Sequence, residues 1–154
     1  YNSIKKMFDL GSVNSISDYL SWLEDCYLLF FVSKFSWSPK SRNINPRKVY
    51  AIDTGLIQNN TLSFSKDSGR MLENTVYLFL RQKNLDIYYF KEKKECDFVL
   101  FEKNTCVQCI QVCEEVHREN KERELNGLLE ALHFFNMPQG YIITKNQELS
   151  LIHI

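Results

Sequence analysis

The stretch that decides the fold is ECDFVLFE at residues 95–102, followed after a short turn by VQCIQVCE at residues 107–114. Both runs are rich in aromatic and apolar residues, which favours two consecutive strands. Side chains alternate along a strand, so Asp97 is expected to share a face with Val99 and Phe101. Cys96 and Phe98 are expected on the other face. Aspartate is disfavoured in strands, and Asp97 is interpreted either as a site residue or as part of a polar strand edge.

Two further groups are expected beside Asp97. Gln111 and Cys113 are two residues apart on the second strand and therefore share a face. Glu73 lies on an expected helix with Val76 and Leu80 at helical spacing. A carboxylate on such an apolar stripe is costly unless it is paired or binds a metal, although it could also serve the helix dipole near the helix start. We expect Glu73, Asp97, Gln111 and Cys113 to converge.

The chain divides into two expected units. Residues 1–60 suggest a helix at 3–10 ended by Gly11, a helix starting near the capping-box spacing of residues 15–18, and strands at 28–35 and 49–52. Ile16, Tyr19, Leu20 and Leu23 would form one apolar face of the second helix, and the polar segment 36–46 would connect the strands. Residues 61–154 predict a helix at 69–83, strands at 87–91, 95–102 and 107–114, a helix at 119–135 and a strand at 141–144. This order suits an α/β (α+β) mixed sheet flanked by helices.

Composition limits the class of protein. With 154 residues, 44% hydrophobic and 14% aromatic, the chain can build one full core or two small ones. The net charge is zero, so affinity for nucleic acid would have to come from a local patch. No apolar run reaches the roughly 18 residues of a membrane span, and no signal-peptide pattern opens the chain. The odd count of 5 cysteines favours reduced thiols, and we expect a cytoplasmic protein without membrane contact.

Both ends of the sequence suggest a gene fragment. The chain begins at Tyr1, without methionine, inside an apparently organised segment. Residues 149–154, Leu-Ser-Leu-Ile-His-Ile, resemble the translation of a transposase adapter used in shotgun sequencing. We therefore expect residues 149–154 not to be native and leave them out of functional reasoning, although their alternation could still form a strand.

Several motifs together resemble one large family. They are KVYAIDTGL (48–56), GRMLEN (69–74), YFK (89–91), ECDFV (95–99), QVC (111–113) and RELNGLLE (123–130). In this order they are similar to the C-terminal region of prokaryotic AAA-type ATPases, which carry a winged helix and a restriction-endonuclease-like domain of unknown function. The resemblance covers residues 1 to about 148 and implies a truncated winged-helix unit, without its first helix, followed by a PD-(D/E)XK-type domain. ATP would bind only an upstream module, because no GxxxxGK[ST] loop occurs here.

The resemblance also implies which site residues are missing. In PD-(D/E)XK nucleases a helix Glu, a strand Asp and an (Asp/Glu)-x-Lys pair gather Mg²⁺. Glu73 and Asp97 match the two metal ligands, but Gln111 and Cys113 replace the second carboxylate and the lysine. A neutral amide is a poor Mg²⁺ ligand and a neutral thiol cannot act as the lysine does. Glu115 or Lys121 would be the residues to compensate if the site is active.

One basic segment stands out in this neutral chain. Between residues 34 and 48 there are five basic residues, Lys34, Lys40, Arg42, Arg47 and Lys48, with Trp37 among them and no acid. Phosphate contact by this ribbon predicts sequence-independent, salt-sensitive DNA binding. A solvated loop, or a surface docked on the upstream ATPase module, are the alternatives.

The remaining candidates carry weaker signals. Cys106 and Cys109 lack the other ligands of a closed zinc site, and on a regular strand they would face opposite ways, so buried core thiols are the favoured interpretation. The three histidines form no constellation. The resemblance lets Arg123 face the nuclease-like site, whereas an ordinary charge at a helix start is the simpler interpretation.

These patterns predict a non-catalytic accessory region of a AAA-type ATPase that contacts DNA or a partner protein. No cofactor is expected in this fragment. An active Mg²⁺-dependent nuclease is the first alternative, and a structural platform for partner binding or oligomerisation is the second.

Overall fold

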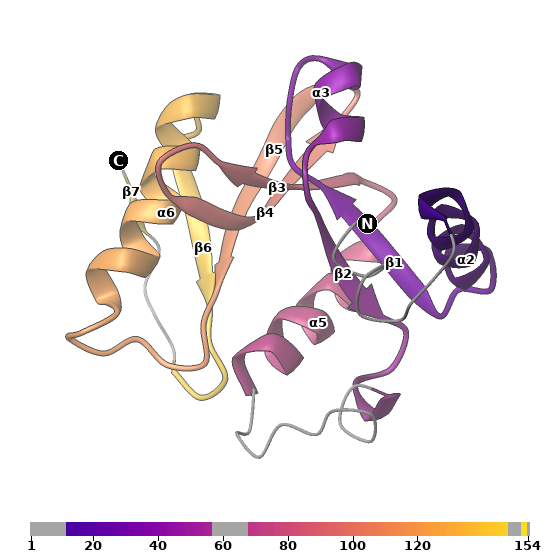
Figure 1. Ribbon diagram of the computed structural model, residues 1–154. Helices are drawn as coiled ribbons and strands as arrows, with labels where there is room; N and C mark the ends of the chain where they lie inside the picture. The colour runs from indigo at the N-terminus through magenta and orange to yellow at the C-terminus, as the bar shows by residue number, and fades with distance from the viewer. Residues whose placement is uncertain (1–11, 57–67, 148–151, 154) are drawn as a thin grey trace.

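The computed structural model describes residues 12–56, 68–147 and 152–153. Its N-terminal half contains α2 (Val13–Asp25), β1 (Leu29–Ser33), α3 (Pro39–Ile44) and β2 (Arg47–Ala51), shown in Figure 1. The rest contains α5 (Ser68–Arg81), β3 (Asp86–Lys91), β4 (Glu95–Glu102), β5 (Thr105–Val112), α6 (Lys121–Phe135), β6 (Gln139–Ile143) and β7 (Ile152–His153). The predicted mixed α/β class is confirmed.

Two sheets organise the described chain. β1 and β2 form an antiparallel ribbon, and the second sheet has the order β3-β4-β5-β6-β7. Its strands pair antiparallel except for β5 and β6, which are parallel, as a mixed sheet requires. The two-residue β7 extends the edge of this sheet beside β6. Whether residues 149–154 are native stays untested by this pairing.

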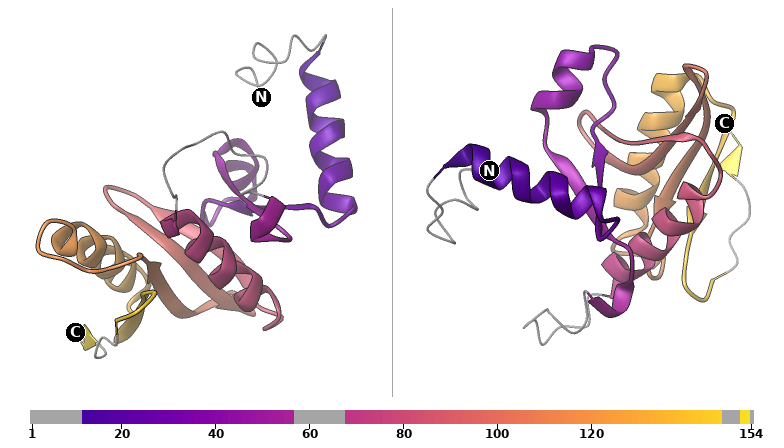
Figure 2. Two further views of the ribbon diagram at one scale, coloured as in Figure 1. Left: turned by 90° about the horizontal axis from the view of Figure 1, so that it is seen from below. Right: turned by 90° about the vertical axis from the view of Figure 1, so that its right-hand side faces the viewer.

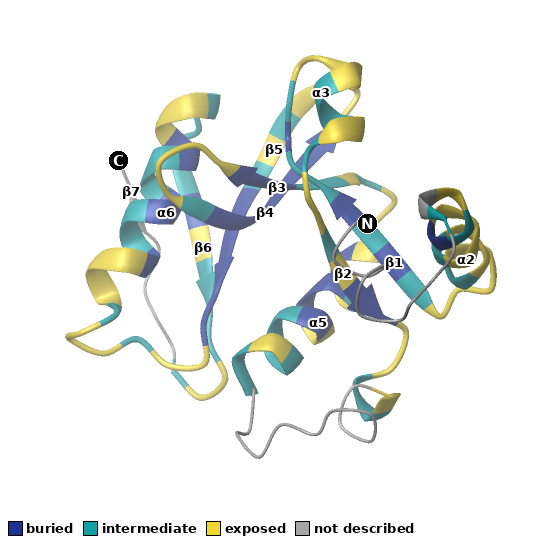
Figure 3. Cartoon of the chain, viewed as in Figure 1, coloured by how far each residue is buried: buried dark blue, intermediate teal, exposed yellow. Residues whose placement is uncertain are grey.

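The large sheet lies between two groups of elements, with α6 on one face and α5 with the ribbon on the other (Figure 2). On the α5 face, Phe98, Leu100 and Ile110 pack with residues of α5 and with Phe30 and Tyr50 of the ribbon. On the α6 face, the sheet residues pack against Leu128, Ala131 and Leu132 of that helix. The buried residues therefore run along the sheet and the inward sides of both helices (Figure 3).

A β-bulge changes the predicted alternation of β4. Phe90 pairs with Cys96 and Tyr88 pairs with Val99, so Tyr89 lies opposite two residues, Asp97 and Phe98. Such an extra residue breaks the alternation of side chains and re-aims them. Cys96 accordingly packs on the α6 face with Val99, while Phe98 packs on the α5 face. The expectations that Cys96 shares a face with Phe98, and Asp97 with Val99 and Phe101, were wrong for this reason.

The N-terminal region departs from the predictions in two places. α2 begins before the predicted capping box, because the Ser12 side chain caps it by accepting a hydrogen bond from the Ser15 N–H at 3.1 Å. Ile16 is buried, but Tyr19 is 48% exposed and does not share its environment. The segment 36–46 connects the strands as expected, but it also contains the short helix α3, started by Ser38 and Pro39, which was not predicted. The helix predicted at 3–10 lies outside the described residues.

The C-terminal elements follow the predicted order closely. β4 has the predicted bounds, and the other strands and helices of this region begin and end within about two residues of expectation, which is the usual uncertainty of element ends. The ribbon shares the α5-side core with the large sheet through Phe30, Val32 and Tyr50. The winged-helix and nuclease-like assignments, and the boundary near residue 60, stay predictions.

Gly127 of α6 sits where the helix approaches the backbone of β4. A Cβ at this position would lie 2.1 Å from the Glu95 carbonyl oxygen. We expect Gly127→Ala to force α6 away from the sheet and to lower the free energy of unfolding by about 1–3 kcal/mol, the usual cost of overpacking. Urea denaturation followed by circular dichroism measures this change.

Gly69→Ala is the matched control. Gly69 lies in α5 and a Cβ there meets nothing within 4 Å. This variant should keep the wild-type stability or gain up to about 1 kcal/mol, because alanine favours helix. Equal losses in both variants would show that the close approach of α6 is not the cause.

Candidate functional site

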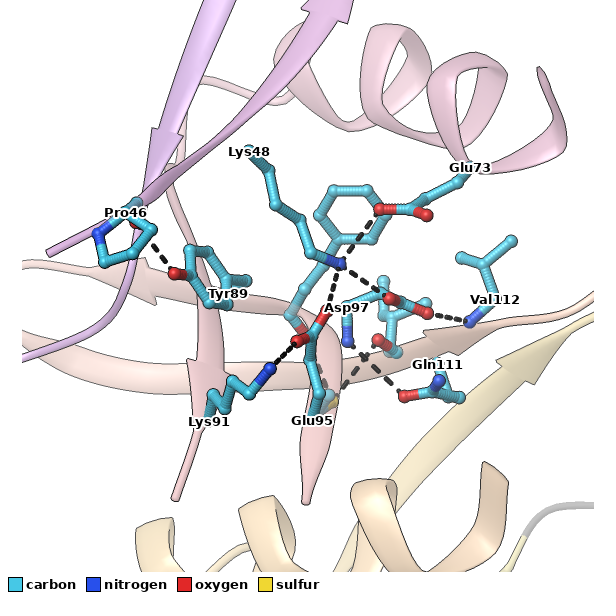
Figure 4. A network of polar contacts seen from close by, with 12 residues as sticks. Pro46, Lys48, Glu73, Tyr89, Lys91, Glu95, Asp97, Gln111 and Val112 are labelled. Atoms are coloured by element: carbon cyan, nitrogen blue, oxygen red, sulfur yellow. Dashed lines mark hydrogen bonds and ion pairs between the residues drawn. The ribbon is translucent and has the colours of Figure 1, made fainter. Parts of the chain in front are cut away.

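Three carboxylates from two elements surround one lysine of a third (Figure 4). The Lys48 Nζ atom lies 2.8 Å from Asp97 Oδ1, 3.0 Å from Glu73 Oε1 and 3.0 Å from Glu95 Oε1. Lys48 belongs to β2, Glu73 to α5, and the other two carboxylates to β4. We call these four residues the lysine-carboxylate cluster.

The position of Lys48 follows from the side-chain alternation of β2. Lys48 pairs with Val32 and Tyr50 pairs with Phe30, and these partners belong to the core, whereas Val49 between them is exposed. The inward face of the ribbon therefore carries Lys48 toward the sheet, and only 19% of its side chain is exposed. Burial opposes the charge, but Asp97 and Glu73 outweigh it and raise the pKa of Lys48.

Asp97 is the most buried carboxylate of the cluster. One oxygen accepts from Lys48, and the other accepts from the Val112 N–H at 2.9 Å. Burial raises the pKa of Asp97 to about 6, and the charge of Glu73 adds to this rise, while Lys48 and the bond from Val112 work against it. Asp97 therefore titrates nearer to neutral pH than an ordinary aspartate.

Glu73 is held by hydroxyl and ammonium donors together. Its Oε1 accepts from the Tyr50 hydroxyl at 2.7 Å and from Lys48 at 3.0 Å. Burial, and then the charge of Glu73, raise the pKa of Tyr50, which keeps the phenol protonated as a donor. The neighbouring Asn74 side chain donates to the Ala51 carbonyl at 2.9 Å and accepts from the Ala51 N–H at 2.8 Å. α5 and β2 are thus joined by adjacent polar contacts.

Gln111 lies beside Asp97 but turns toward α6. Its Oε1 accepts from the Asp97 N–H at 3.4 Å, and its Nε2 donates to Glu124 Oε2 at 2.8 Å. Glu124 is buried and also accepts from Arg123 Nε at 2.9 Å. The amide therefore bridges β4 and a buried carboxylate of α6, and its donor group is already used.

Cys113 lies at the end of β5, where its N–H donates to the Ile143 carbonyl. Burial, with the charges of Glu124 and Asp97, raises the pKa of Cys113 to about 11. The thiol stays neutral at physiological pH and cannot replace a lysine. The structure therefore brings Glu73, Asp97 and Gln111 to one cleft, whereas Cys113, just after β5, lines the neighbouring cleft with Arg123 and Glu124.

The donor set does not fit a Mg²⁺ ion. Glu73 and Asp97, the predicted metal ligands, direct their oxygens at the Lys48 ammonium. Within residues 12–56, 68–147 and 152–153, no group of three or more His, Cys, Asp or Glu side chains is arranged to hold a metal. Glu115 and Lys121, named as compensating residues, are exposed. In the described part of the chain they form no ion pair or hydrogen bond with the cluster carboxylates.

The mixed charges of the adjoining cleft are a second feature of the site. Glu73, Glu95, Asp97, Gln111 and Glu124 line it, together with Lys91, Lys93, Lys94 and Arg123. Arg123 therefore does border the site, through its bond with Glu124. Both signs of charge meet in one cleft, and no single sign dominates it.

The predicted DNA-binding residues do not form one surface. Lys48 points inward, and Lys34 pairs with Glu92 at 3.5 Å. Arg47 lies over the Phe31 ring at 4.7 Å, and Arg42 donates to the Tyr88 hydroxyl at 2.8 Å. Lys40 is exposed on α3. DNA binding by these residues stays a prediction.

A second bulge brings Cys106 and Cys109 together. Leu100 pairs with Gln108 and Phe101 pairs with Cys106, which leaves Val107 as an extra residue in β5. The two sulfur atoms lie 3.8 Å apart, so the expectation that they face opposite ways was wrong. Both pack with the α6-side core, and all five cysteines are free thiols.

Sequence reasoning missed several residues that complete the site. Tyr50, Asn74, Glu95 and Glu124 were not singled out, and Lys48 was assigned to DNA contact. The available signal for Lys48 was its two-residue spacing from Tyr50 on a strand whose intervening residue is Val49. Asn74 and Glu124 stand beside the motif residues Glu73 and Arg123.

The comparisons with known proteins give two matches. A family model described as a domain of unknown function (DUF8612) matches residues 1–67. The uncharacterized protein MJ1544 of Methanocaldococcus jannaschii is 38% identical over 154 residues, which covers 96% of this chain and 34% of that protein. The chain thus spans about a third of the length of the curated relative it matches. No solved structure matches.

None of the described helices combines the length and apolar character needed to cross a bilayer.

Removing the cation should destabilise the protein. Lys48→Met keeps most of the side-chain volume but removes the cation that faces Glu73 and Asp97, while Glu95 keeps its ion pair with Lys91 at 3.0 Å. We expect the free energy of unfolding at pH 7 to fall by about 2–4 kcal/mol, somewhat below the cost of breaking a fully buried pair. Urea denaturation measures this loss.

The pH dependence and a control identify the cause. The pKa of Asp97 in the folded protein, about 6, is above its ordinary 3.8, and it rises further without Lys48. Asp97 therefore stabilises the fold at low pH and loses that contribution as the pH rises through its folded pKa. The loss in Lys48→Met should be smaller at pH 5 than at pH 7. Lys40→Met on exposed α3 should stay within about 0.5 kcal/mol of wild type at both values, and a pH-independent loss would contradict the ion-pair account.

Proposed function

We propose that this chain is a non-catalytic accessory region of a AAA-type ATPase that contacts DNA. In this proposal the carboxylates of a nuclease-like site now serve to hold the ribbon, α5 and the large sheet together. The observation that carries it is the position of Lys48, whose ammonium lies within 3.0 Å of Glu73, Glu95 and Asp97. A protein cation stands where a metal-dependent nuclease would need its divalent ion.

The chemistry of the neighbouring residues supports the absence of cleavage. Metal-assisted phosphodiester hydrolysis needs anionic oxygen ligands and a group that stabilises charge on the phosphate. Gln111 gives a neutral amide that is engaged with Glu124, and Cys113 gives a neutral thiol. Displacing Lys48 from the cluster would leave a buried lysine without its partners, which is costly.

Two observations support attachment to a larger ATPase. The motifs at 48–56, 69–74 and 95–99 resemble the C-terminal region of such proteins, and the chain spans only 34% of the relative that it matches. The ATP site would then belong to a module outside this sequence. DNA contact is supported by the two basic residues of the acid-free segment 34–48 that lie on α3, Lys40 and Arg42. Docking of that segment on the ATPase module is the competing explanation.

One observation favours an active nuclease as the second candidate. Lys48 places a lysine against Asp97, and lysine is the residue type that the motif lost at Cys113. Catalysis would then require Lys48 to leave the carboxylates when metal and DNA bind. Cleavage assays separate the two candidates directly.

We expect the purified chain to leave DNA intact in the presence of Mg²⁺ or Mn²⁺. The reason is that Glu73 and Asp97 are engaged with Lys48, while Gln111 and Cys113 supply neither the carboxylate nor the lysine of the motif. Supercoiled plasmid and labelled single-stranded DNA are incubated with each ion, and nicking is followed on gels beside the Asp97→Ala variant. Metal-dependent nicking that disappears in Asp97→Ala would establish the nuclease and sink the non-catalytic proposal.

DNA binding should depend strongly on salt and on α3. If Lys40 and Arg42 contact phosphates, the logarithm of the duplex-binding constant should fall linearly with the logarithm of salt concentration, with a slope of about −0.9 per phosphate. The Lys40→Gln, Arg42→Gln double variant should flatten that slope by about one to two units for every duplex sequence. Filter binding at several salt concentrations measures both.

The Arg118→Gln, Lys121→Gln double variant is the control of equal charge. Both residues are exposed near the start of α6, away from α3 in Figure 1. Its slope should match wild type. Duplex binding that is undetectable, or that neither double variant changes, would favour docking of this surface on the ATPase module.

A further inference from the structure

Trp37 is exposed although its ring is held in place. It follows β1 and precedes α3, and 67% of its surface is accessible. Its ring packs edge-on against Phe35 with centroids 4.9 Å apart at 84°, and lies 6.3 Å from Phe101 at 85°. Phe35 and Phe101 are both buried, so the indole is fixed at its base and open to solvent elsewhere.

A second exposed ring lies beside the same buried phenylalanine. Phe134, near the end of α6, is 46% exposed. Its centroid lies 6.3 Å from Phe35 and 4.9 Å from Phe90. Two solvent-facing aromatic rings are therefore anchored on Phe35, from segments about 100 residues apart along the chain.

Positive charge is fixed to the same aromatic cluster. Arg42 donates to the Tyr88 hydroxyl at 2.8 Å and its guanidinium lies 5.5 Å from the centre of that ring. The Tyr88 ring in turn packs on Phe35 at 5.8 Å. Lys40 is exposed and extends the charge along α3. We call Trp37, Phe134, Lys40 and Arg42 the aromatic-basic surface.

This combination fits single strands better than duplexes. Proteins that hold single-stranded nucleic acid combine cations along the backbone with aromatic rings that stack on bases. In a duplex the base faces are covered by their neighbours, so Trp37 and Phe134 would have nothing to stack on.

We propose that the aromatic-basic surface binds single-stranded DNA, with bases stacked on Trp37 and Phe134 and phosphates held by Lys40 and Arg42. This inference rests on the proposed DNA contact and names the form of DNA. The stacking requires no metal and no rearrangement of the lysine-carboxylate cluster.

The two tryptophans of the chain allow a direct test. Trp22 lies on α2, packed against Tyr19 at 5.3 Å, and the sequence contains 2 tryptophans. In Trp22→Phe the remaining indole is Trp37, and in Trp37→Phe it is Trp22. A titration with an oligothymidylate of about ten nucleotides, within the usual site sizes, should quench the fluorescence of Trp22→Phe and leave that of Trp37→Phe unchanged.

Affinity measurements give the second readout. Trp37→Ala should weaken oligothymidylate binding about five- to 100-fold, the loss expected for one stacked base. Its affinity for a duplex of equal length should stay within about two-fold of wild type. Trp22→Ala should change neither, and circular dichroism of each variant confirms that the fold is retained.

Each result bears on a different proposal. If oligothymidylate binds without quenching Trp37, and Trp37→Ala binds as wild type does, the stacking surface is wrong while the DNA contact stands. If neither single-stranded nor duplex DNA binds, the proposed DNA contact is overturned and this inference falls with it. A quench confined to Trp37, with the selective loss of single-strand affinity in Trp37→Ala, supports the inference.

Discussion

The ion pairs of Lys48 are the contacts on which the arrangement of this protein depends. Glu73, Glu95 and Asp97 would repel one another in a partly buried site, and the ammonium at 2.8–3.0 Å offsets part of this repulsion. Because the lysine comes from β2, the same contact binds the ribbon to α5 and to the sheet. The hydroxyl of Tyr50 and the amide of Asn74 extend this seam, so every polar group there has a partner along one line of contact. The buried aromatic contact of Tyr50 with Tyr77, at 4.3 Å, lies beneath it.

Backbone irregularities place the functional side chains. The bulge opposite Tyr89 lets Asp97 and Phe98 both address the α5 side of the sheet, so the carboxylate reaches Lys48 while the ring next to it enters the core. Its second oxygen then receives the Val112 N–H from β5. The bulge at Val107 turns Cys106 and Cys109 into neighbours in the same way. In both strands one extra residue interrupts the regular pairing and changes the direction of the neighbouring side chains.

These irregularities also mark where prediction from the sequence ends. Apolar patterning located β4, α6 and the mixed sheet, because burial against a helix imposes a period that the residues display. The order of the motifs placed Glu73, Asp97 and Gln111 near one another. The sequence did not predict three features: the face of Cys96, the close approach of the Cys106 and Cys109 sulfur atoms, and the helix α3. These features depend on a register shift or on a local helix cap. The sequence did not predict the role of Lys48 for another reason. Its partners come from positions 25 to 49 residues away, and no local pattern records such a contact.

The basic segment from Lys34 to Lys48 thus places positive charge both in the interior and at the surface. Lys48 directs its charge inward to the three carboxylates, while Lys40 is exposed on α3 and Arg42 of the same helix donates to the Tyr88 hydroxyl. α3 lies between β1 and β2 in the chain. The contacts of Lys48 that fix the ribbon therefore also fix the position of α3 relative to the sheet. On the proposed function, this explains why carboxylates of a nuclease-like site persist without the rest of its chemistry. On that proposal, the carboxylates hold the lysine of the ribbon whose strands flank α3, and none of them touches DNA.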